Sequence, residues 1–442
     1  MLATDPVLGS TLQAAELTDA WAVLSLAERL EGLRLLPTEE LETLLAALTP
    51  REHKDVLLAA PTHEARTWIR LLPPDDLADV IQEAESHDRG RLLDLLDPTG
   101  RREVVALLAY AEDEAGGLMN PRYARLRPDM SVDEAISYLR RQTQRQVETV
   151  YYLYVLDTEQ RLMGVISFRE LFLAGSERRV RDVMRSDVVT VHEEMDQEAV
   201  SEVFARHDLL AIPVIGEDGR MKGIVTVDDI VDVVREEATE DLQKMGGMAA
   251  LESPYLETPF WEMLRKRAGW LAVLFAGEML TASAMGYFEH EIAQVVFLAL
   301  FVPLIISSGG NSGSQASTLV VRALALGELG LRDWWRVIRR ELASGAVLGA
   351  ILGVLGFARI LVWQGVFDAY GPHTAPLGLT LAASLVAVVT FGTLVGSILP
   401  LGLQRLGFDP ASASAPLVAT VVDVSGIVIY FLAASFFLGD FL

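Results

Sequence analysis

Residues 409–438 read DPASASAPLVATVVDVSGIVIYFLAASFFL, and most of this stretch is apolar. From Ala411 to Leu438 it is long enough to cross a hydrocarbon core of roughly 30 Å at about 1.5 Å per helical residue. One carboxylate, Asp423, lies twelve residues past Ala411, which is about 18 Å along a helix and near the middle of a membrane. An ionised side chain at that depth is costly, and it usually belongs to an ion path or to an ion pair. The stretch therefore predicts a membrane span that carries a charge.

A structural alternative for Asp423 is a pair with Arg359, in an earlier apolar segment, or with side chains near Glu278. Arg359 lies in the outer half of its segment, from where its long side chain can reach the lipid headgroups instead. We therefore favour a cation site at Asp423.

Four more apolar segments precede this one, at residues 268–288, 292–326, 342–367 and 377–403, which gives five predicted spans. Lys and Arg residues occur before the first span, around the link from the second to the third, and before the fifth, whereas the other two links have none. The positive-inside rule then predicts a multi-pass protein of the cytoplasmic (inner) membrane with a cytoplasmic N-terminus and an outside C-terminus. The first residues lack a basic segment followed by an apolar run, so we expect no cleavable signal.

The second span contains an unusual polar segment, PLIISSGGNSGSQAST, at residues 303–318. We expect Pro303 and the glycines at 309, 310 and 313 to loosen or break the helix and to free backbone carbonyls. Helix packing through small residues is the alternative, and the third span has its own small-residue set in Gly345, Gly349 and Gly353. Packing does not explain the two amide side chains. The segment therefore predicts a pore lining, which comprises Gly309, Gly310, Asn311, Gln315 and, from the fifth span, Ala419.

Charge is divided unevenly along the 442 residues, whose formal net charge is −24. From Trp270 onward there are 7 Lys and Arg against 10 Asp and Glu, so this part carries −3 and the part before it carries −21. So acidic a surface repels nucleic acid and attracts divalent cations. Because the chain has no cysteine, a bound metal must use oxygen or imidazole ligands.

Two repeats organise the acidic part. Residues 20–112 predict short amphipathic helices separated by Pro37, Pro50, Pro61, Pro73 and Pro98, which must stack on one another as in a helical solenoid. Further on, Met119, Met130 and Ala135 recur as Met184, Met195 and Val200 at a constant offset of 65. Each copy then predicts a helix, a strand, a short turn (158–161 or 217–220), a strand and a helix.

This second repeat resembles a tandem pair of cystathionine-β-synthase (CBS) domains over about residues 118–240. Such pairs commonly sense ligands, and a Thr/Ser-x-x-Asp arrangement often holds a nucleotide in them. The resemblance thus implies adenine nucleotide, such as ATP, at Thr226 and Asp229, whereas the first copy has Ser167 and Glu170. The alternative is that Thr226 caps the helix that begins near Asp228.

An acidic helix, DVVREEATEDLQKMGGM at residues 232–248, follows the repeat. Like charges three and four residues apart destabilise a helix unless something neutralises them. The run is either a solvated face or, given its position before the first span, a gating linker.

The whole chain resembles the MgtE family of magnesium transporters. The motifs that carry this resemblance are LLDLLDP (92–98), YAEDEAGGLMNP (110–121), the CBS pair, the acidic helix, GGNSGSQ (309–315), DPASASAP (409–416) and TVVDVSG (420–426). The resemblance implies a homodimer whose second and fifth spans line one pore, with Asp423 at the selectivity site. It also implies cytoplasmic magnesium ligands, which fall on Asp75, Asp79, Asp229, Asp232, Glu237, Glu240 and Asp241.

We therefore predict a multidomain membrane protein and a magnesium-selective, channel-like transporter that is shut by cytoplasmic Mg²⁺. Its parts are a helical solenoid (1–117), two α/β CBS domains (118–180 and 181–240), a connecting helix (241–267) and an all-α domain of five transmembrane helices (268–442). A CBS-regulated anion channel would need basic groups in the pore, which Asp423 argues against. A membrane-anchored enzyme is the other rival, but no nucleophile–base pair, phosphate-binding loop or HExxH motif is present, so we expect no enzyme.

Overall fold

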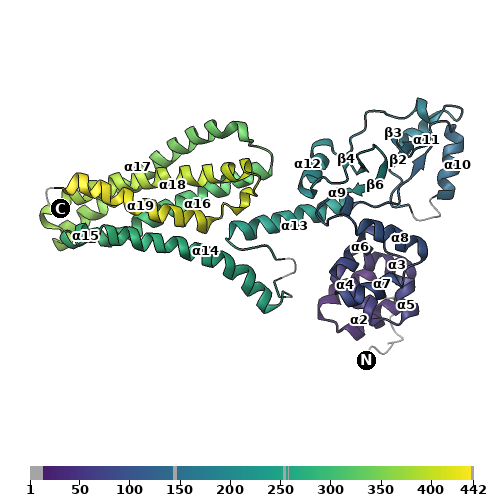
Figure 1. Ribbon diagram of the computed structural model, residues 1–442, viewed down its shortest axis with the longest axis horizontal. Helices are drawn as coiled ribbons and strands as arrows, with labels where there is room; N and C mark the ends of the chain where they lie inside the picture. The colour runs from purple at the N-terminus through teal and green to yellow at the C-terminus, as the bar shows by residue number, and fades with distance from the viewer. Residues whose placement is uncertain (1–12, 143–146, 252–254, 257, 440–442) are drawn as a thin grey trace. The chain divides into compact units, whose positions relative to one another are not determined.

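The computed structural model describes residues 13–142, 147–251, 255–256 and 258–439 (Figure 1). Two compact units are present, one up to Arg235 and one from Glu236 onward. Residues 1–12 belong to the segment in which we expect no cleavable signal peptide, and they lie outside the described residues.

The N-terminal part of the first unit is a stack of short helices. In chain order they are α1 (Ala14–Ala20), η1 (Trp21–Val23), α2 (Leu26–Leu35), α3 (Thr38–Ala46), α4 (Pro50–Ala59), α5 (Thr62–Trp68), α6 (Pro74–Glu83), α7 (Ser86–Leu93) and α8 (Pro98–Leu107). Each predicted proline stands at a helix start: Pro37, Pro61 and Pro73 precede a helix, and Pro50 and Pro98 are first residues. The wider interval after Pro73 holds two helices, α6 and α7. The predicted helical stack is confirmed.

The CBS pair follows in the same unit. The first copy has α9 (Ala115–Leu118), β1 (Arg125–Leu126), α10 (Val132–Gln142), β2 (Tyr152–Leu156), β3 (Leu162–Ser167) and α11 (Phe168–Leu173). The second has η3 (Val180–Asp182), β4 (Val191–His192), α12 (Gln197–His207), β5 (Ala211–Ile215), β6 (Met221–Thr226) and α13 (Val227–Met245). In both copies the first strand is parallel to the second, and the second and third form an antiparallel hairpin.

The offset between the copies changes within the repeat. The helices α10 and α12 keep the predicted offset of 65, but β2 and β5 are offset by 59, because the first copy has a longer connection before its hairpin. Both hairpins turn at the predicted residues, with positive φ at Gln160 and at the equivalent Gly219. Tyr154 and Leu156 of one sheet pack against Met221 and Ile224 of the other, which joins the two copies.

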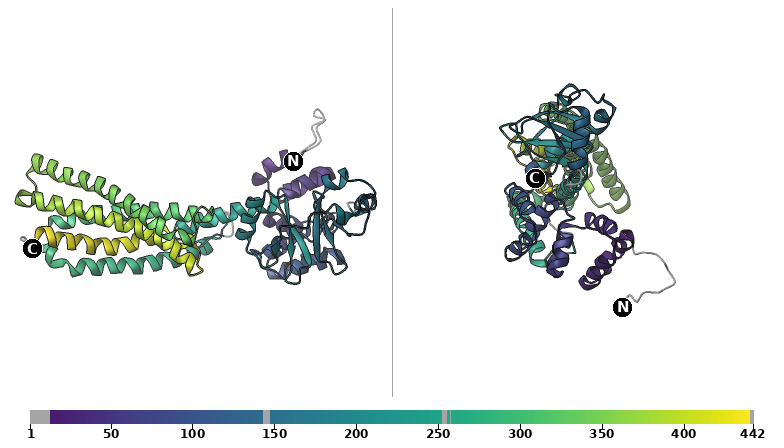
Figure 2. Two further views of the ribbon diagram at one scale, coloured as in Figure 1. Left: turned by 90° about the horizontal axis from the view of Figure 1, so that it is seen from above. Right: turned by 90° about the vertical axis from the view of Figure 1, so that its right-hand side faces the viewer.

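Among the described residues of the second unit, five helices are long and apolar enough to cross a membrane by length and composition. They are α14 (Phe260–Tyr287), α16 (Phe297–Ala325), α17 (Trp334–Phe367), α18 (Thr374–Arg405) and α19 (Ala415–Leu438), and the shorter elements between them are α15 (Glu289–Gln294), η4 (Leu331–Asp333), η5 (Gly371–His373) and η6 (Pro410–Ser412). Figures 1 and 2 show α16, α17, α18 and α19 side by side, and α14 packs against α19. The predicted number of spans is confirmed.

The predicted break in the second span is wrong. Helix α16 is continuous through residues 303–318 and keeps Pro303 inside it, and the interruption lies earlier, between α15 and α16. The glycines serve close packing instead: a Cβ built on Gly309 would lie 2.5 Å from Val388 on α18 and 2.7 Å from Val422 on α19. A Cβ on Gly392 or Gly396 of α18 would overlap the carbonyl oxygen of Gly309 or Gly313, respectively. Small residues on both helices thus let the two backbones touch.

Close packing through glycines also joins α17 to α18. A Cβ on Gly349 would lie 2.6 Å from the Cα of Val386, and one on Gly353 would lie 3.0 Å from the carbonyl oxygen of Ala382. The predicted small-residue set of the third span is therefore a packing face.

The fifth helix begins later than predicted. Pro410–Ser412 form a 3₁₀ turn, and the Ser414 hydroxyl accepts a hydrogen bond from the Leu417 amide (3.3 Å), which starts α19 at Ala415. On α16 the Ser317 hydroxyl donates to the Ala413 carbonyl (2.7 Å). These bonds fix the start of α19 against α16 and place Asp423 eight residues, about 12 Å, into the helix.

Replacing Gly396 by Ala should destabilise the membrane part by about 1–3 kcal/mol, because the new methyl group overlaps backbone rather than a movable side chain. Thermal unfolding of the full-length protein in detergent measures this. Gly402→Ala on the same helix is the matched control, since a Cβ there meets nothing within 4 Å. Equal melting temperatures for the two variants would contradict the packing argument.

Candidate functional site

Asp423 lies on the face of α19 that meets the glycine segment of α16. A Cβ built on Gly310 would lie 3.4 Å from the Cβ of Ala419 and 3.9 Å from Oδ1 of Asp423. Three of the predicted pore residues, Gly310, Ala419 and Asp423, are therefore neighbours. The absent side chain of Gly310 leaves the Asp423 carboxylate half-buried rather than covered.

The two amides of α16 lie on its exposed side. Asn311 and Gln315 are both exposed, and the Asn311 amide nitrogen lies 3.4 Å from the hydroxyl of Ser307. These three residues are four apart in sequence and share one polar stripe of the helix. Gly309, in contrast, is buried between α18 and α19, so it is a packing residue and not part of the exposed stripe.

Arg359 is not the partner of Asp423. Its guanidinium stands over the rings of Trp363 (4.6 Å) and Phe301 (5.6 Å), as in cation–π contacts. The side chain that does reach Asp423 is Glu278 of α14, whose carboxyl group is within hydrogen-bonding distance of the Asp423 carboxyl group. Glu278 also lies 3.5 Å from the hydroxyl of Thr420, one turn before Asp423.

A second acidic cluster lies in the first unit, around Asn120. The amide nitrogen of this buried residue donates to Oδ1 of Asp75 (3.1 Å) and to Oε2 of Glu148 (2.8 Å). Asp75 is 8% exposed. Burial first, and then the charges of Asp229 and Asp76, raise the pKa of Asp75 well above its usual value.

Helices α6 and α13 both begin with an acidic doublet, and the two doublets face each other. Burial, with Asp228 and Asp232 adding repulsion, raises the pKa of Asp76 to about 6. Burial, partly offset by the Thr226 hydrogen bond, raises the pKa of Asp229 to about 7. The predicted Asp75, Asp229 and Asp232 are thus brought together, whereas Asp79 lies on the exposed side of α6.

Thr226 and Asp229 are engaged with each other. The Thr226 hydroxyl donates to Oδ2 of Asp229 (2.6 Å), and the Thr226 amide lies 3.3 Å from the same oxygen. Ser167 and Glu170 make the equivalent contacts in the first copy, where they form a capping box at the start of α11. The geometry of the pair is that of a helix start.

The acidic end of α13 surrounds a lysine in the second unit. The Lys244 ammonium donates to Asp409 (2.6 Å), which directly precedes η6, and it also pairs with Glu240. Burial and the charges of Asp409 and Glu237 raise the pKa of Asp241 to about 6, although Lys244 opposes this. Glu237, Glu240 and Asp241 therefore lie in a crowded acidic region into which Lys244 brings a positive charge.

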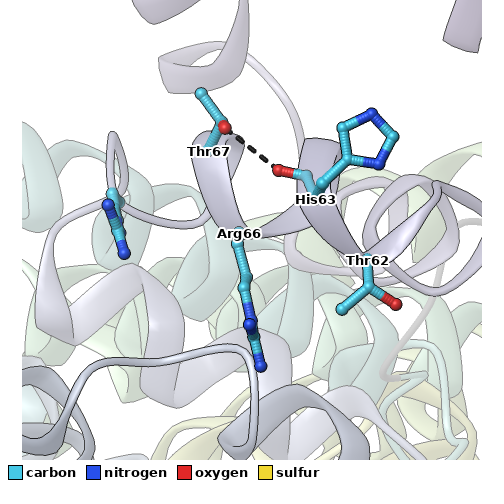
Figure 3. A pocket seen from close by; sticks show the side chains of 5 residues that line it. Thr62, His63, Arg66 and Thr67 are labelled. Carbon is cyan, nitrogen blue, oxygen red and sulfur yellow. Dashed lines mark hydrogen bonds between the residues drawn. The ribbon is translucent and has the colours of Figure 1, made fainter.

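Within the described residues, no three acidic or histidine side chains converge closely enough to hold a metal ion by themselves. A hollow beside α5 is lined by Thr62, His63, Arg66, Thr67 and Arg70 (Figure 3). Its lining is basic, and His63 and Arg66 point in different directions (Figure 3). This hollow does not suit a cation, and its lining includes none of the predicted site residues.

Several site residues escaped the sequence analysis: Asn120, Glu148, Asp76, Asp228, Lys244, Asp409 and Glu278. The doublets at 75–76 and 228–229 are visible as repeated acids at helix starts, and Glu278 is the sole charged residue of residues 268–288. Those signals could have found three of the seven, Asp76, Asp228 and Glu278. Asn120, Glu148, Lys244 and Asp409 depend on contacts between elements that are distant in sequence.

Three family models match the chain. One described as a divalent cation transporter, MgtE, matches residues 302–433, and the MgtE intracellular N domain matches residues 12–113. The CBS domain model matches residues 115–177 and 180–236.

Curated relatives cover most of the chain. The magnesium transporter MgtE of Thermus thermophilus is 43% identical over 75% of this chain and 71% of its own length. That of Bacillus subtilis is 36% identical over 76% of this chain and 72% of its own length.

Among solved structures, the cytosolic domain of the Mg²⁺ channel MgtE in complex with ATP is similar to this chain. It is 42% identical, and the match covers 50% of this chain and 90% of that chain at a TM-score of 0.48.

Replacing Asp229 by Asn should flatten the pH dependence of the first unit's stability. The pKa of Asp229 is about 7 in the folded protein and about 3.9 when unfolded, so the folded state gains protons and stability is lost as pH rises from about 4 to 7. At pH 8 the variant, which still accepts the Thr226 hydrogen bond, should be more stable by about 1–3 kcal/mol. Hydrogen exchange of α6 and α13 in the full-length protein measures this.

The exposed Glu217→Gln is the matched control, since it removes one charge from a turn of the same repeat. A pH dependence in Asp229→Asn as steep as in the wild type would contradict the assignment.

Proposed function

Because the chain belongs to the MgtE family of magnesium transporters, we propose that it is a magnesium-selective, channel-like transporter closed by cytoplasmic Mg²⁺. The observation that carries the pore assignment is the meeting of Asp423 on α19 with Gly310 on α16, at the polar segment of a membrane-spanning helix. We propose that its Mg²⁺ is both cargo and regulator. Consistent with the family, we assign it no enzymatic reaction.

The chemistry of Mg²⁺ supports an oxygen-lined path. This ion is small, holds its octahedral water shell tightly and dehydrates reluctantly. A path that passes it quickly should therefore contact the hydrated ion through carboxylate, amide and hydroxyl groups. Asp423 and the exposed stripe of Ser307, Asn311 and Gln315 offer these groups on adjoining helices.

The pore is proposed to lie on the two-fold axis of a homodimer, in the cytoplasmic membrane. Each subunit then contributes one Asp423, and the two facing carboxylates match the charge of one divalent ion. We propose a cytoplasmic N-terminus and an outside C-terminus, which the distribution of Lys and Arg supports. An anion channel is disfavoured because Arg359, the sole basic residue of α17 beyond Arg340, stands over aromatic rings and not beside Asp423.

The proposed sensor is a set of carboxylates that lie on α6 and along α13. In the first unit it comprises Asp75, Asp79, Asp229 and Asp232, and on the acidic end of α13 it comprises Glu237, Glu240 and Asp241. Burial first, and the charges of neighbouring acids second, raise the pKa values of Asp76, Asp229 and Asp241, which supports a cost of their charged forms at neutral pH. Mg²⁺ that bridges such groups, within or between subunits, would remove that cost and favour the closed state.

A ligand shifts a two-state gate only by its different affinity for the two states. To change the ratio of closed to open channels from about 1:99 to 99:1, the ligand must bind the closed state more tightly by roughly 5.5 kcal/mol. Several weak sites acting together can supply this, and they make the response steep. We therefore propose a gate that shuts over a narrow range of internal Mg²⁺.

Adenine nucleotide at Thr226 and Asp229 stays a further proposal, supported by the spacing of the two residues and by the resemblance to the CBS family. The hydrogen bonds of the pair are those of a helix start, so ATP would have to share or replace the hydrogen bond between Thr226 and Asp229. We also keep as a proposal the division of the chain at residues 117, 180, 240 and 267.

Replacing Asp423 by Ala should lower Mg²⁺ flux into liposomes roughly 100-fold or remove its selectivity, because each subunit loses a charge-assisted contact of about 1.5–3 kcal/mol. The variant should remain folded and dimeric. Glu328→Ala, which removes one exposed carboxylate between α16 and α17, serves as the control. If Asp423→Ala transports Mg²⁺ with unchanged selectivity, the assignment of Asp423 to the pore is wrong.

Neutralising Asp232, Glu237, Glu240 and Asp241 together should leave a pore that stays open in high internal Mg²⁺. Patch recordings with Mg²⁺ on the cytoplasmic side measure the closing concentration, which we expect to rise at least about 10-fold as several bridges are lost. A matched control removes four exposed carboxylates elsewhere in the first unit, at Glu39, Glu42, Glu159 and Glu217. If the sensor variant closes at the wild-type concentration, the acidic helix is only a solvated linker.

A further inference from the structure

Two of the membrane-spanning helices carry a single carboxylate in their apolar stretch, and these two carboxylates meet. Glu278 is the one charged residue of residues 268–288, and Asp423 is the one charged residue of residues 411–438. Glu278 lies nine residues before the end of α14, which is about 14 Å from that end and close to mid-membrane. The two acids therefore lie at one depth, on helices that pack against each other.

The contact is held by a close approach of α14 to α19. A Cβ built on Gly277 would lie 2.5 Å from the Cγ2 of Thr420, so a side chain at this position would push the helices apart. Thr420 stands one turn before Asp423, and its hydroxyl lies 3.5 Å from Oε1 of Glu278. On the same face of α14, four residues after Gly277, the Thr281 hydroxyl is buried without a hydrogen-bond partner among the described residues.

Nothing basic neutralises this pair. Among the described residues, no Lys, Arg or His contacts either carboxyl group. Two carboxylates within hydrogen-bonding distance repel unless a proton or a cation lies between them. A pair of acids at mid-membrane without a counter-charge is otherwise a costly arrangement, and packing alone does not require it.

We propose that Glu278 is a second acidic contact for the ion at Asp423, so that α14, as well as α16 and α19, contributes to the ion path. This inference rests on the proposed function. Its ligand is a hydrated divalent cation, and the carboxylate of Glu278, exposed in the single chain, accepts hydrogen bonds from the water shell of the ion. Its role is to favour divalent over monovalent cations by adding one negative charge per subunit at the depth of Asp423.

Glu278→Gln tests this role, because it removes the charge and keeps the shape of the side chain. Full-length protein in liposomes is assayed for initial Mg²⁺ flux against external Mg²⁺ concentration, and for Na⁺ flux in the same preparation. We expect the half-saturating Mg²⁺ concentration to rise about 10-fold, because charge-assisted hydrogen bonds are about twice as strong as neutral ones, and Na⁺ flux to increase. Glu289→Gln at the start of α15, an equal change of charge outside the pair, should leave both values unchanged.

The controls separate this inference from the proposed function. If Glu278→Gln keeps wild-type values while Asp423→Ala loses selectivity, Glu278 is only a helix contact and the inference alone is overturned. If Asp423→Ala also keeps wild-type selectivity, the pore assignment fails with it. If Glu278→Gln does not fold, Glu278→Asp is tested instead. This variant keeps the charge, but its shorter side chain withdraws the carboxylate from Asp423. A raised half-saturating Mg²⁺ concentration then supports the contact, and an unchanged one overturns it.

Discussion

The constraint on which this protein's architecture depends is negative charge that is held close together in places partly removed from water. In the first unit, acidic doublets at the starts of α6 and α13 face each other around Asn120, and their pKa values rise. In the second unit, Asp423 and Glu278 meet at membrane depth. Burial first, and repulsion between neighbouring acids second, make the charged forms of the carboxyl groups in the first unit costly. In the function that we propose, a bound divalent cation would relieve this cost in both places, so that one chemistry would serve transport and regulation.

The glycines of α16 and α18 make the membrane site possible. Because backbone meets backbone at Gly309 and Gly392, and again at Gly313 and Gly396, α16 is held close to α18 without any side chain between them. Gly310, on the neighbouring face, then stands beside Asp423, whose side chain stays half-buried. Helix α16 therefore packs tightly against α18 with one face and presents a polar stripe on another.

Much of the fold was predictable from periodicity and composition. Proline positions located the short helices, the repeat of Met119, Met130 and Ala135 located the CBS pair, and apolar length located the five spans. The break in the second span was mispredicted, since a glycine that breaks an isolated helix can equally serve close packing, and only the partner helix decides which. Glu278 was passed over as a site residue for the same reason: its meaning depends on which helix packs against α14. Asp423 needed no partner to stand out.

The most direct test of the account is the Mg²⁺ current of the wild-type protein in patch recordings as Mg²⁺ on the cytoplasmic side is raised. Transport and closure by the same ion are then observed on one molecule. We predict a Mg²⁺ current at low internal Mg²⁺ that falls steeply to zero as several sites fill. A current that is independent of internal Mg²⁺, or that is carried by anions, would contradict it.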